Sequence, residues 1–416
     1  MDEQSISFLH LADTHFGVNY AIKPKNLQRR AYGELFFQKV NDVIDTAISK
    51  HNVDFILHSG DFFNRSKPPP LVIERAVQPF VLAAKHGIPV YLLPGNHERS
   101  KLPLGLISYY DDINLLDKPS SYCFEKNGIR IKITGFPYIR HNAKNKFGAT
   151  IRRAWNNYNA KGNTPQHYFI MLTHQLIEGS RIENYTFRRG DNVILYQQIP
   201  KKFHYIACGH VHRFQFLLKP PGFVGGSSIV QSTNRIFSIQ QDCSNRIWRF
   251  HHKLTFPSTR FKDPVIAYSG SLERVSMMER NEPKGYIIGK LYLSEQDDKI
   301  QTAEYSFHPL SAIEMVYCVW DLSKESIHEC VDQTLDKLYS INSSRLKPQY
   351  KEKRPLSAVF RIKILGEWNS SSEMLEKFDL LKQEAKRLNI YLTFSYNPYP
   401  HEEENYIPYK KSNAII

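Results

Sequence analysis

The chain has 416 residues, which is long enough for two or three domains, and a net charge of +14 with an isoelectric point near 9.3. Such a surplus of Lys and Arg is typical of nucleic-acid-binding proteins, although many basic proteins bind none. Five scattered cysteines without a CxxC pair argue against a disulfide framework and a structural zinc site. There is no leader-like start and no apolar run long enough for a membrane span, so we expect a cytoplasmic protein that does not associate with membranes.

Short apolar runs alternate with amphipathic stretches over the first half of the chain. The runs bounded by Gly, Asp or Pro predict buried strands at 5–11, 53–59, 89–94, 129–136, 167–174 and 204–210. The stretches between them predict helices at 27–50, 71–86 and 146–160. This alternation predicts a layered α/β domain.

The second half of the chain changes character. Residues 214–263 are rich in aromatic and cationic side chains without clean periodicity, which indicates an inserted set of hairpins or a loop. A smaller α+β unit follows, with strands expected at 284–293 and 357–365 and helices at 326–339 and 372–388. We therefore expect a domain at 1–280 with the insert at about 214–263, a second domain at 281–400 and a polar tail at 401–416.

Side chains that bind metals follow five of the expected strands. They are Asp13 and His15, then Asp61, then Asn96 and His97, then His174, and finally His210 and His212. Taken alone, Asp13 could be a helix N-cap and Asp61 part of an ordinary turn. Because neighbouring strands of an α/β sheet deliver their carboxyl ends to one crevice, the repeated placement favours a dinuclear metal site.

Other histidines have a simpler explanation. His10, His58, His86 and His204 lie inside or beside apolar runs. We expect them to be partly buried or surface residues, and not metal ligands.

The residue types also suggest the chemistry. Asp, Asn and His without Cys suit Mn²⁺, Fe²⁺ or Zn²⁺ and do not indicate a thiolate site. A carboxylate shared by two cations can position a hydroxide that attacks phosphorus, which is phosphoester hydrolysis. His97, next to Asn96, would be free to stabilise the phosphoryl oxygens or to protonate the leaving oxygen.

These motifs resemble those of the calcineurin-like metallophosphoesterase superfamily. The resemblance implies a two-sheet sandwich flanked by helices, with Asp61 bridging two metals and His97 as the catalytic histidine. It assigns one metal to Asp13, His15, Asp61 and His212, and the other to Asp61, Asn96, His174 and His210.

Four further segments are similar to the SbcD-type nuclease subunits of double-strand-break-repair complexes: HLADTHFG, GDFFNRSKP, YSGSLERV (268–275) and EPKGYIIG (282–289). This likeness implies single-strand endonuclease and 3′-to-5′ double-strand exonuclease activity with two Mn²⁺, a DNA-binding cap formed by the smaller unit, a homodimer, and an SbcC-type ABC ATPase partner. The alternatives are a small-molecule or cyclic-nucleotide phosphodiesterase, or a DNA-end-binding scaffold whose catalysis is secondary.

The chain departs from this pattern in three ways. Asn64 stands where many of these nucleases have a histidine that assists exonuclease cleavage. Residues 214–267 separate the GHVHR and YSGS motifs, which are usually close together, and we see no helical pair of the kind that docks on the ATPase coiled coil.

Cations cluster near the metal motifs. Most such clusters are solvated surface, but some of these should line the DNA path and contact phosphates. The candidates are Lys23, Arg29, Arg30, Arg99, Lys101 and Arg140, and neighbouring cations are Lys25, Lys144, Lys146, Arg188 and Arg189.

Overall fold

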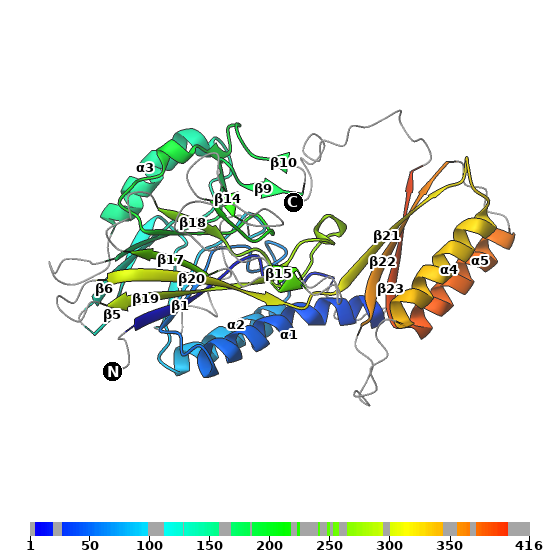
Figure 1. The fold of residues 1–416 in the computed structure, drawn as a ribbon, viewed down its shortest axis with the longest axis horizontal. Coiled ribbons are helices and arrows are strands. Elements are labelled where there is room, and N and C mark those ends of the chain that lie inside the picture. Colours follow the sequence, from blue (N-terminus) through cyan, green and yellow to red (C-terminus); the bar gives the residue numbers. More distant parts are fainter. Residues whose placement is uncertain are drawn as a thin grey trace. The chain divides into compact units, whose positions relative to one another are not determined.

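The computed structural model describes residues 5–19, 27–98, 112–127, 129–157, 168–183, 185–217, 264–293, 300–343, 356–366 and 372–397, together with strand segments at 223–224, 240–241, 248–249 and 253–257. The chain forms two compact units (Figure 1). The first comprises Met1–Val18, Phe36–Val275 and Asn281–Ala312, and the second comprises Asn19–Leu35, Ser276–Arg280 and Ile313–Ile416.

The first unit contains two large mixed sheets. In the first sheet the strand order is β17-β20-β19-β1-β2-β3-β4, and β1 to β4 run parallel while β19, β20 and β17 add antiparallel neighbours. The strands are β1 (Ser5–Leu11), β2 (Phe55–His58), β3 (Val90–Leu92), β4 (Ile113–Leu115), β17 (Lys253–Pro257), β19 (Lys284–Leu293) and β20 (Ile300–Leu310).

The second sheet has the order β14-β13-β18-β12-β7-β6-β5, with β6, β7, β12 and β18 parallel. Its strands are β5 (Ser120–Lys126), β6 (Ile129–Gly135), β7 (Tyr168–Thr173), β12 (Tyr205–Cys208), β13 (Gln215–Leu217), β14 (Phe223–Val224) and β18 (Val265–Tyr268). Short pairs are formed by β8 (Leu176–Ile177) with β11 (Val193–Ile194), β9 (Arg181–Ile182) with β10 (Tyr185–Thr186), and β15 (Gln240–Gln241) with β16 (Trp248–Arg249).

A hydrophobic core lies between the inner faces of the two sheets. Phe8 and Phe55 from the first sheet pack in one cluster with Ile170, Tyr205 and Phe216 from the second. Alternate residues of each strand point the other way, which is the pattern of a sheet buried on both faces. The predicted two-sheet α/β sandwich flanked by helices is confirmed.

Helices cover the outer faces of both sheets (Figure 1). In α2 (Pro70–Lys85), Phe80 packs against His58 and Phe62 beside the first sheet, and α1 (Leu27–Ser49) places Phe37 against Phe16. In α3 (Ala143–Asn156), Phe147 and Ile151 pack in a cluster with side chains of the second sheet. None of the helices in the described ranges is long and apolar enough to span a membrane.

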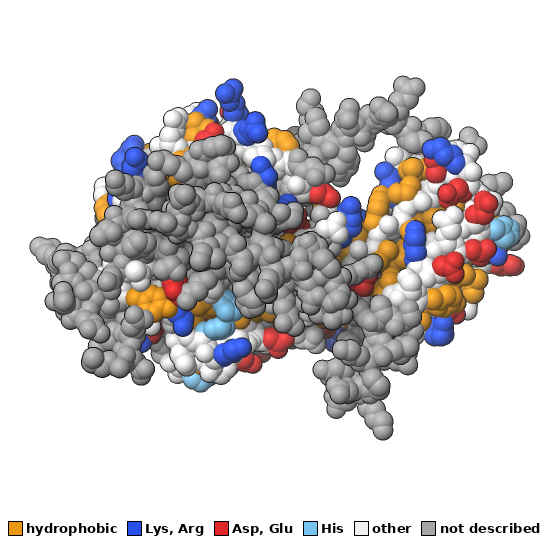
Figure 2. Space-filling view, in the orientation of Figure 1, with side chains coloured by type: hydrophobic (Ala, Val, Ile, Leu, Met, Phe, Trp, Pro, Cys, Tyr) orange, Lys and Arg blue, Asp and Glu red, His pale blue; other side chains and the backbone are white. Residues whose placement is uncertain are grey.

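The second unit is built around a parallel sheet of β21 (Glu314–Asp321), β22 (Ala358–Leu365) and β23 (Ile390–Asn397), with α4 (Ile327–Ser343) and α5 (Ser372–Arg387) between the strands in the chain. Phe360 and Ile362 face the helices and form a core with Leu338 and Leu381. Apolar and cationic side chains share the surface near these strands (Figure 2). The helices expected at 326–339 and 372–388 and the strand at 357–365 correspond to α4, α5 and β22.

The segment 284–293 does not begin the smaller unit, in contrast to the expectation from sequence. It forms β19, which pairs with β1 from Ser5↔Tyr292 to His10↔Ile287, and Ile287 and Leu291 enter the core between the large sheets. Burial against the first sheet therefore assigns this strand to the first unit, and the smaller sheet starts at Glu314. Within the expected insert, the described β17 likewise pairs with β20 at the edge of the first sheet.

We expect Phe8→Ala to lower the free energy of unfolding by about 3–5 kcal/mol, because it leaves a cavity in a well-packed core. The Phe8 ring is fully buried and lies 5.2 Å from Phe55 and 5.3 Å from Tyr205 between centroids. Urea unfolding measures the loss. The control is Leu82→Ala on α2, where the side chain is 39% exposed, and a similar loss in both variants would contradict this account of the core.

Candidate metal centre

The predicted metal ligands converge at one edge of the sandwich. Asp13 and His15 follow β1, Asp61 follows β2 and Asn96 follows β3, three adjacent parallel strands of the first sheet. His174 follows β7 and the pair His210 and His212 follows β12, adjacent parallel strands of the second sheet. Since parallel strands end at the same edge, residues spread over 200 positions become neighbours.

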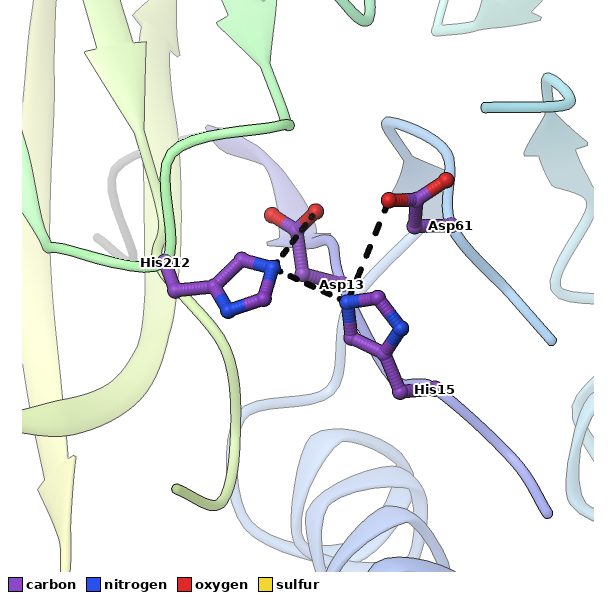
Figure 3. Close-up of side chains that lie close together, drawn as sticks. All are labelled: Asp13, His15, Asp61 and His212. Carbon is purple, nitrogen blue, oxygen red and sulfur yellow. Dashed lines mark hydrogen bonds and ion pairs between the residues drawn. The ribbon is translucent and has the colours of Figure 1, made fainter. Parts of the chain in front are cut away.

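The first donor group consists of Asp13, His15, Asp61 and His212, whose ligand-type atoms all lie within 4.8 Å of one another. Figure 3 shows these side chains clustered, with Asp13 and His15 on the segment after β1 and Asp61 and His212 on two other segments. The two imidazole Nε2 atoms of His15 and His212 are 2.9 Å apart. His212 Nε2 lies 3.8 Å from Asp13 Oδ1, and His15 Nε2 lies 3.9 Å from Asp61 Oδ2.

The second donor group consists of Asp61, His174 and His210, again within 4.8 Å. Asn96 completes it, because its Oδ1 lies 2.9 Å from His174 Nε2 and 2.8 Å from His210 Nδ1. His174 Nε2 is also 3.2 Å from Asp61 Oδ2. Asp61 is thus the one carboxylate common to both groups.

The backbone is strained where it delivers these side chains. Asp13, His15, Asp61 and His210 have positive φ angles of 52°, 45°, 51° and 83°. Residues other than glycine seldom adopt this region, and such strain is concentrated at functional sites. No helix begins at Asp13, since α1 starts at Leu27, so the helix-cap explanation of the first motif is wrong.

Gly60 shows why a glycine precedes Asp61. Its φ is +100°, and a Cβ placed there would lie 2.4 Å from Nδ1 of His174. Any larger residue would clash with the His174 ring. The Gly-Asp pair in the sequence therefore reflects close packing between the loops that follow β2 and β7.

Hydrogen bonds made by Nδ1 fix the orientation of two of the imidazole rings. His174 Nδ1 donates to the backbone oxygen of Ser59 at 2.7 Å, so Nε2 faces Asn96 and Asp61. His97 Nδ1 donates to the backbone oxygen of Asn64 at 3.0 Å, and its Nε2 lies 3.8 Å from Asp61 Oδ2. Such second partners set the tautomer and the ring orientation of metal-binding and catalytic histidines.

Of the histidines expected to be partly buried or at the surface, His10 and His58 are instead fully buried and His204 is partly buried. His10 is fully buried and pairs with the Tyr205 hydroxyl at 2.8 Å and the Ser59 hydroxyl at 2.9 Å. His58 is fully buried beside the Thr14 hydroxyl, and the His204 ring stacks on Tyr168 and Phe169.

Burial and mutual charge shift the pKa values of the clustered side chains. Burial alone would raise the pKa of Asp61, but His174, His15 and His97 outweigh it and lower that pKa well below its usual value. Burial raises the pKa of Asp13 and lowers that of His210 to about 3, whereas Asp61 overcomes burial and raises the pKa of His174 to about 9.

The donor set fits two divalent cations. Asp13 Oδ2 is buried without a hydrogen-bond partner among the described residues, which is costly unless a cation satisfies the oxygen. Imidazole, carboxylate and amide donors without thiolates suit Mn²⁺, Fe²⁺ or Zn²⁺.

Two other residues near the site have roles that sequence reasoning missed. Glu98 is buried and accepts hydrogen bonds from the backbone nitrogens of Phe63 at 2.5 Å and Gly95 at 2.8 Å, so it ties together the loops after β2 and β3. Burial, with Asp61 nearby, raises the pKa of Glu98 to about 8. Tyr138 packs its ring 5.4 Å from His210 and 6.0 Å from His174, and no sequence motif marks it.

The structure describes three of the six cations that were expected to contact DNA. Arg140 is exposed and lies two positions after Tyr138. Arg29 and Arg30 lie in the first turns of α1, where Arg30 is 3.8 Å from Glu34. Lys23, Arg99 and Lys101 lie outside the described residues.

Comparison with known proteins was consistent with this geometry. The family model of calcineurin-like phosphoesterases matches residues 6–214. The chain is 28% identical over 224 residues to the DNA double-strand break repair protein Mre11 of Methanococcus maripaludis, covering 52% of this chain and 53% of that protein.

Two further relatives match this chain at similar identity. The protein of the same name from Methanocaldococcus jannaschii is 27% identical over 285 residues, covering 67% of this chain and 59% of that protein. The uncharacterized metallophosphoesterase YhaO of Bacillus subtilis is 28% identical over 224 residues, covering 51% and 50%. The chain spans about half the length of the curated relatives it matches.

We expect Gly60→Ala to weaken Mn²⁺ binding by roughly tenfold or more, because the new methyl group would displace the predicted ligand His174 from the orientation set by its hydrogen bond to Ser59. Equilibrium titration with Mn²⁺ measures the effect. Gly179→Ala is the matched control, since Gly179 also has a positive φ of +94° but no atom within 4 Å of the position that a Cβ would take. Unchanged Mn²⁺ affinity in Gly60→Ala would show that His174 does not need this close packing.

Proposed function

Since the chain belongs to the calcineurin-like phosphoesterase family, matched over residues 6–214, we propose that it is a Mn²⁺-dependent DNA nuclease that hydrolyses phosphodiester bonds at a two-metal centre. The observation that carries this proposal is the Asp61 carboxylate, which belongs to both donor groups. A shared carboxylate is the arrangement that holds two cations close enough to act on one phosphate.

The donor residues would form two cation sites that share Asp61. Asp13, His15, Asp61 and His212 would hold one cation, and Asp61, Asn96, His174 and His210 the other. Bound cations supply charge neutralisation at the phosphate and activation of water. His97 has its Nδ1 committed to the Asn64 carbonyl, so Nε2 is the nitrogen that can exchange a proton with the leaving oxygen.

Several features favour DNA as the substrate. The net charge of +14 suits a polyanion, and the exposed Arg140 is close in sequence to Tyr138, whose ring packs on His210. The relatives named DNA double-strand break repair protein Mre11 support the same substrate class. We further propose 3′-to-5′ exonuclease and single-strand endonuclease activities, a homodimer and an SbcC-type ABC ATPase partner.

The second unit is proposed to be a DNA-binding cap. Its sheet carries Arg361 on β22 next to Tyr317 on β21 and Thr393 on β23, on the face opposite the helices, and Arg361 and Tyr317 are exposed. Guanidinium, aromatic and hydroxyl groups are the side chains that contact nucleic-acid backbones and bases.

End-labelled double- and single-stranded DNA, incubated with Mn²⁺, Mg²⁺ or EDTA, tests the activity directly. We expect cleavage in Mn²⁺, a fall of about 10²- to 10⁴-fold in His97→Ala from loss of proton transfer, and no measurable cleavage in Asp61→Ala. His86→Ala, which changes an exposed histidine on the turn after α2, should cut like the wild type.

The same proteins assayed on bis(p-nitrophenyl) phosphate separate the alternatives. Hydrolysis of this diester without any DNA cleavage would leave a small-molecule phosphodiesterase. Tight DNA binding without hydrolysis of either substrate would leave a DNA-end-binding scaffold.

We expect Asn64→His to raise exonuclease activity relative to endonuclease activity. In this chain Asn64 orients His97 through its backbone oxygen, so a new imidazole at this position adds a side chain near the centre without removing that bond. The ratio of mononucleotide release from duplex ends to cutting of circular single strands measures the change. An Asn64→Gln control keeps the amide, and an identical ratio in both variants would contradict the expectation.

A further inference from the structure

Lys284, in the EPKGYIIG segment, is a buried cation that the proposed mechanism does not use. Only 1% of the residue is exposed. Its Nζ donates to the backbone oxygen of His212 at 2.9 Å and to the Ser271 hydroxyl at 2.8 Å. An ammonium group is expensive to bury unless its protons are hydrogen-bonded, and these two contacts contribute to holding it in place.

The His212 carbonyl receives contacts from the EPKGYIIG segment, through Lys284, and from the YSGSLERV segment, through Ser271. The backbone nitrogen of Ser271 lies 3.4 Å from it, within YSGSLERV. Gly270 has a φ of +73°, and a Cβ there would lie 3.0 Å from the same oxygen and 2.9 Å from the backbone nitrogen of Phe214. The glycine therefore allows this turn to approach the loop that carries His212.

Different hydrogen bonds hold the two ends of the loop that carries His212. At the start of the loop, the backbone N–H of Gly209 donates to the backbone oxygen of Thr173 at 3.1 Å, and the backbone N–H of His210 donates to Asp13 Oδ1 at 3.0 Å. At its end, Lys284 and Ser271 hold the carbonyl of His212. A second link joins the same segments, because Arg213 Nη1 lies 3.2 Å from Glu282 Oε1.

Lys284 also connects the two sheets. It is the first residue of β19 in the first sheet, whereas His212 follows β12 and Ser271 follows β18 in the second. The first donor group is divided in the same way, since Asp13, His15 and Asp61 come from the first sheet and His212 comes from the second. A bond from β19 to His212 sets this ligand's distance from the other three.

We infer that Lys284, together with Ser271, is a positioning pair that holds His212 in register with Asp13, His15 and Asp61 and so sets the affinity of one of the two cation sites. The inference rests on the proposed two-metal function. It predicts that losing the ammonium group weakens the site containing His212 and spares the site of Asn96, His174 and His210, because the start of the loop keeps its own bonds.

Mn²⁺ titration followed by electron paramagnetic resonance tests this on the full chain. In Lys284→Met we expect one Mn²⁺ to bind about 10- to 100-fold more weakly, as is usual when a contact behind a ligand is lost, and the other to bind as in the wild type. Lys290→Met, an exposed lysine on the same strand, should bind both ions normally.

A double-mutant cycle separates positioning from general stability. If Lys284 acts through His212, adding Lys284→Met to His212→Ala should cause no further loss of Mn²⁺ affinity. Additive losses, or equal weakening of both ions, would overturn the inference. Ser271→Ala, which keeps the Lys284 bond to His212, should weaken the same ion to a smaller extent and serves if Lys284→Met does not fold.

Failure of the two proposals can be told apart. A wild-type protein that binds fewer than two Mn²⁺ and cuts no DNA contradicts the proposed function. If the wild-type protein binds two Mn²⁺ and Lys284→Met binds both ions with wild-type affinity, only the role of Lys284 is contradicted.

Discussion

The position of the Asp61 carboxylate is the constraint on which the rest of the site depends. One of its oxygens accepts the backbone N–H of His97 at 3.0 Å, and the other faces His174, His97 and His15 at 3.2 to 3.9 Å. A buried carboxylate surrounded by imidazoles is stable only if positive charge is close by, and divalent cations or protons supply it. Neighbouring loops therefore have to bring several basic nitrogens to one point.

The topology of the sandwich provides this convergence. Parallel strands in each sheet end at the same edge, and the hydrophobic core between the sheets fixes the distance between those edges. Side chains from the first sheet then meet histidines from the second. Polar links inside the sandwich, such as His10 with Tyr205 and Lys284 with the His212 carbonyl, join the sheets near the site.

Local strain is the cost of this arrangement. Four residues of the two donor groups adopt positive φ angles, and Gly60 and Gly270 permit approaches that a Cβ would prevent. Conformations of this kind persist only where the surrounding structure enforces them. Here the enforcing structure is the pair of large sheets, so the rigidity of the core and the geometry of the site are linked.

The sequence by itself determined the layered α/β class, the five α-helices and eight of the strands that the structure describes, and the set of residues that converge. Apolar periodicity is a local property, and the metal-binding types occur directly after the strands that position them, so Asp13, Asp61 and His174 could be recognised without coordinates. Only the tertiary structure decided that Lys284–Leu293 belongs to the first sheet and that Glu98 ties two loops through their backbone nitrogens. It also decided that Lys284 reaches His212, 72 positions away. These contacts depend on which strands pair and pack across the core, and that choice is made by long-range burial that no local pattern records.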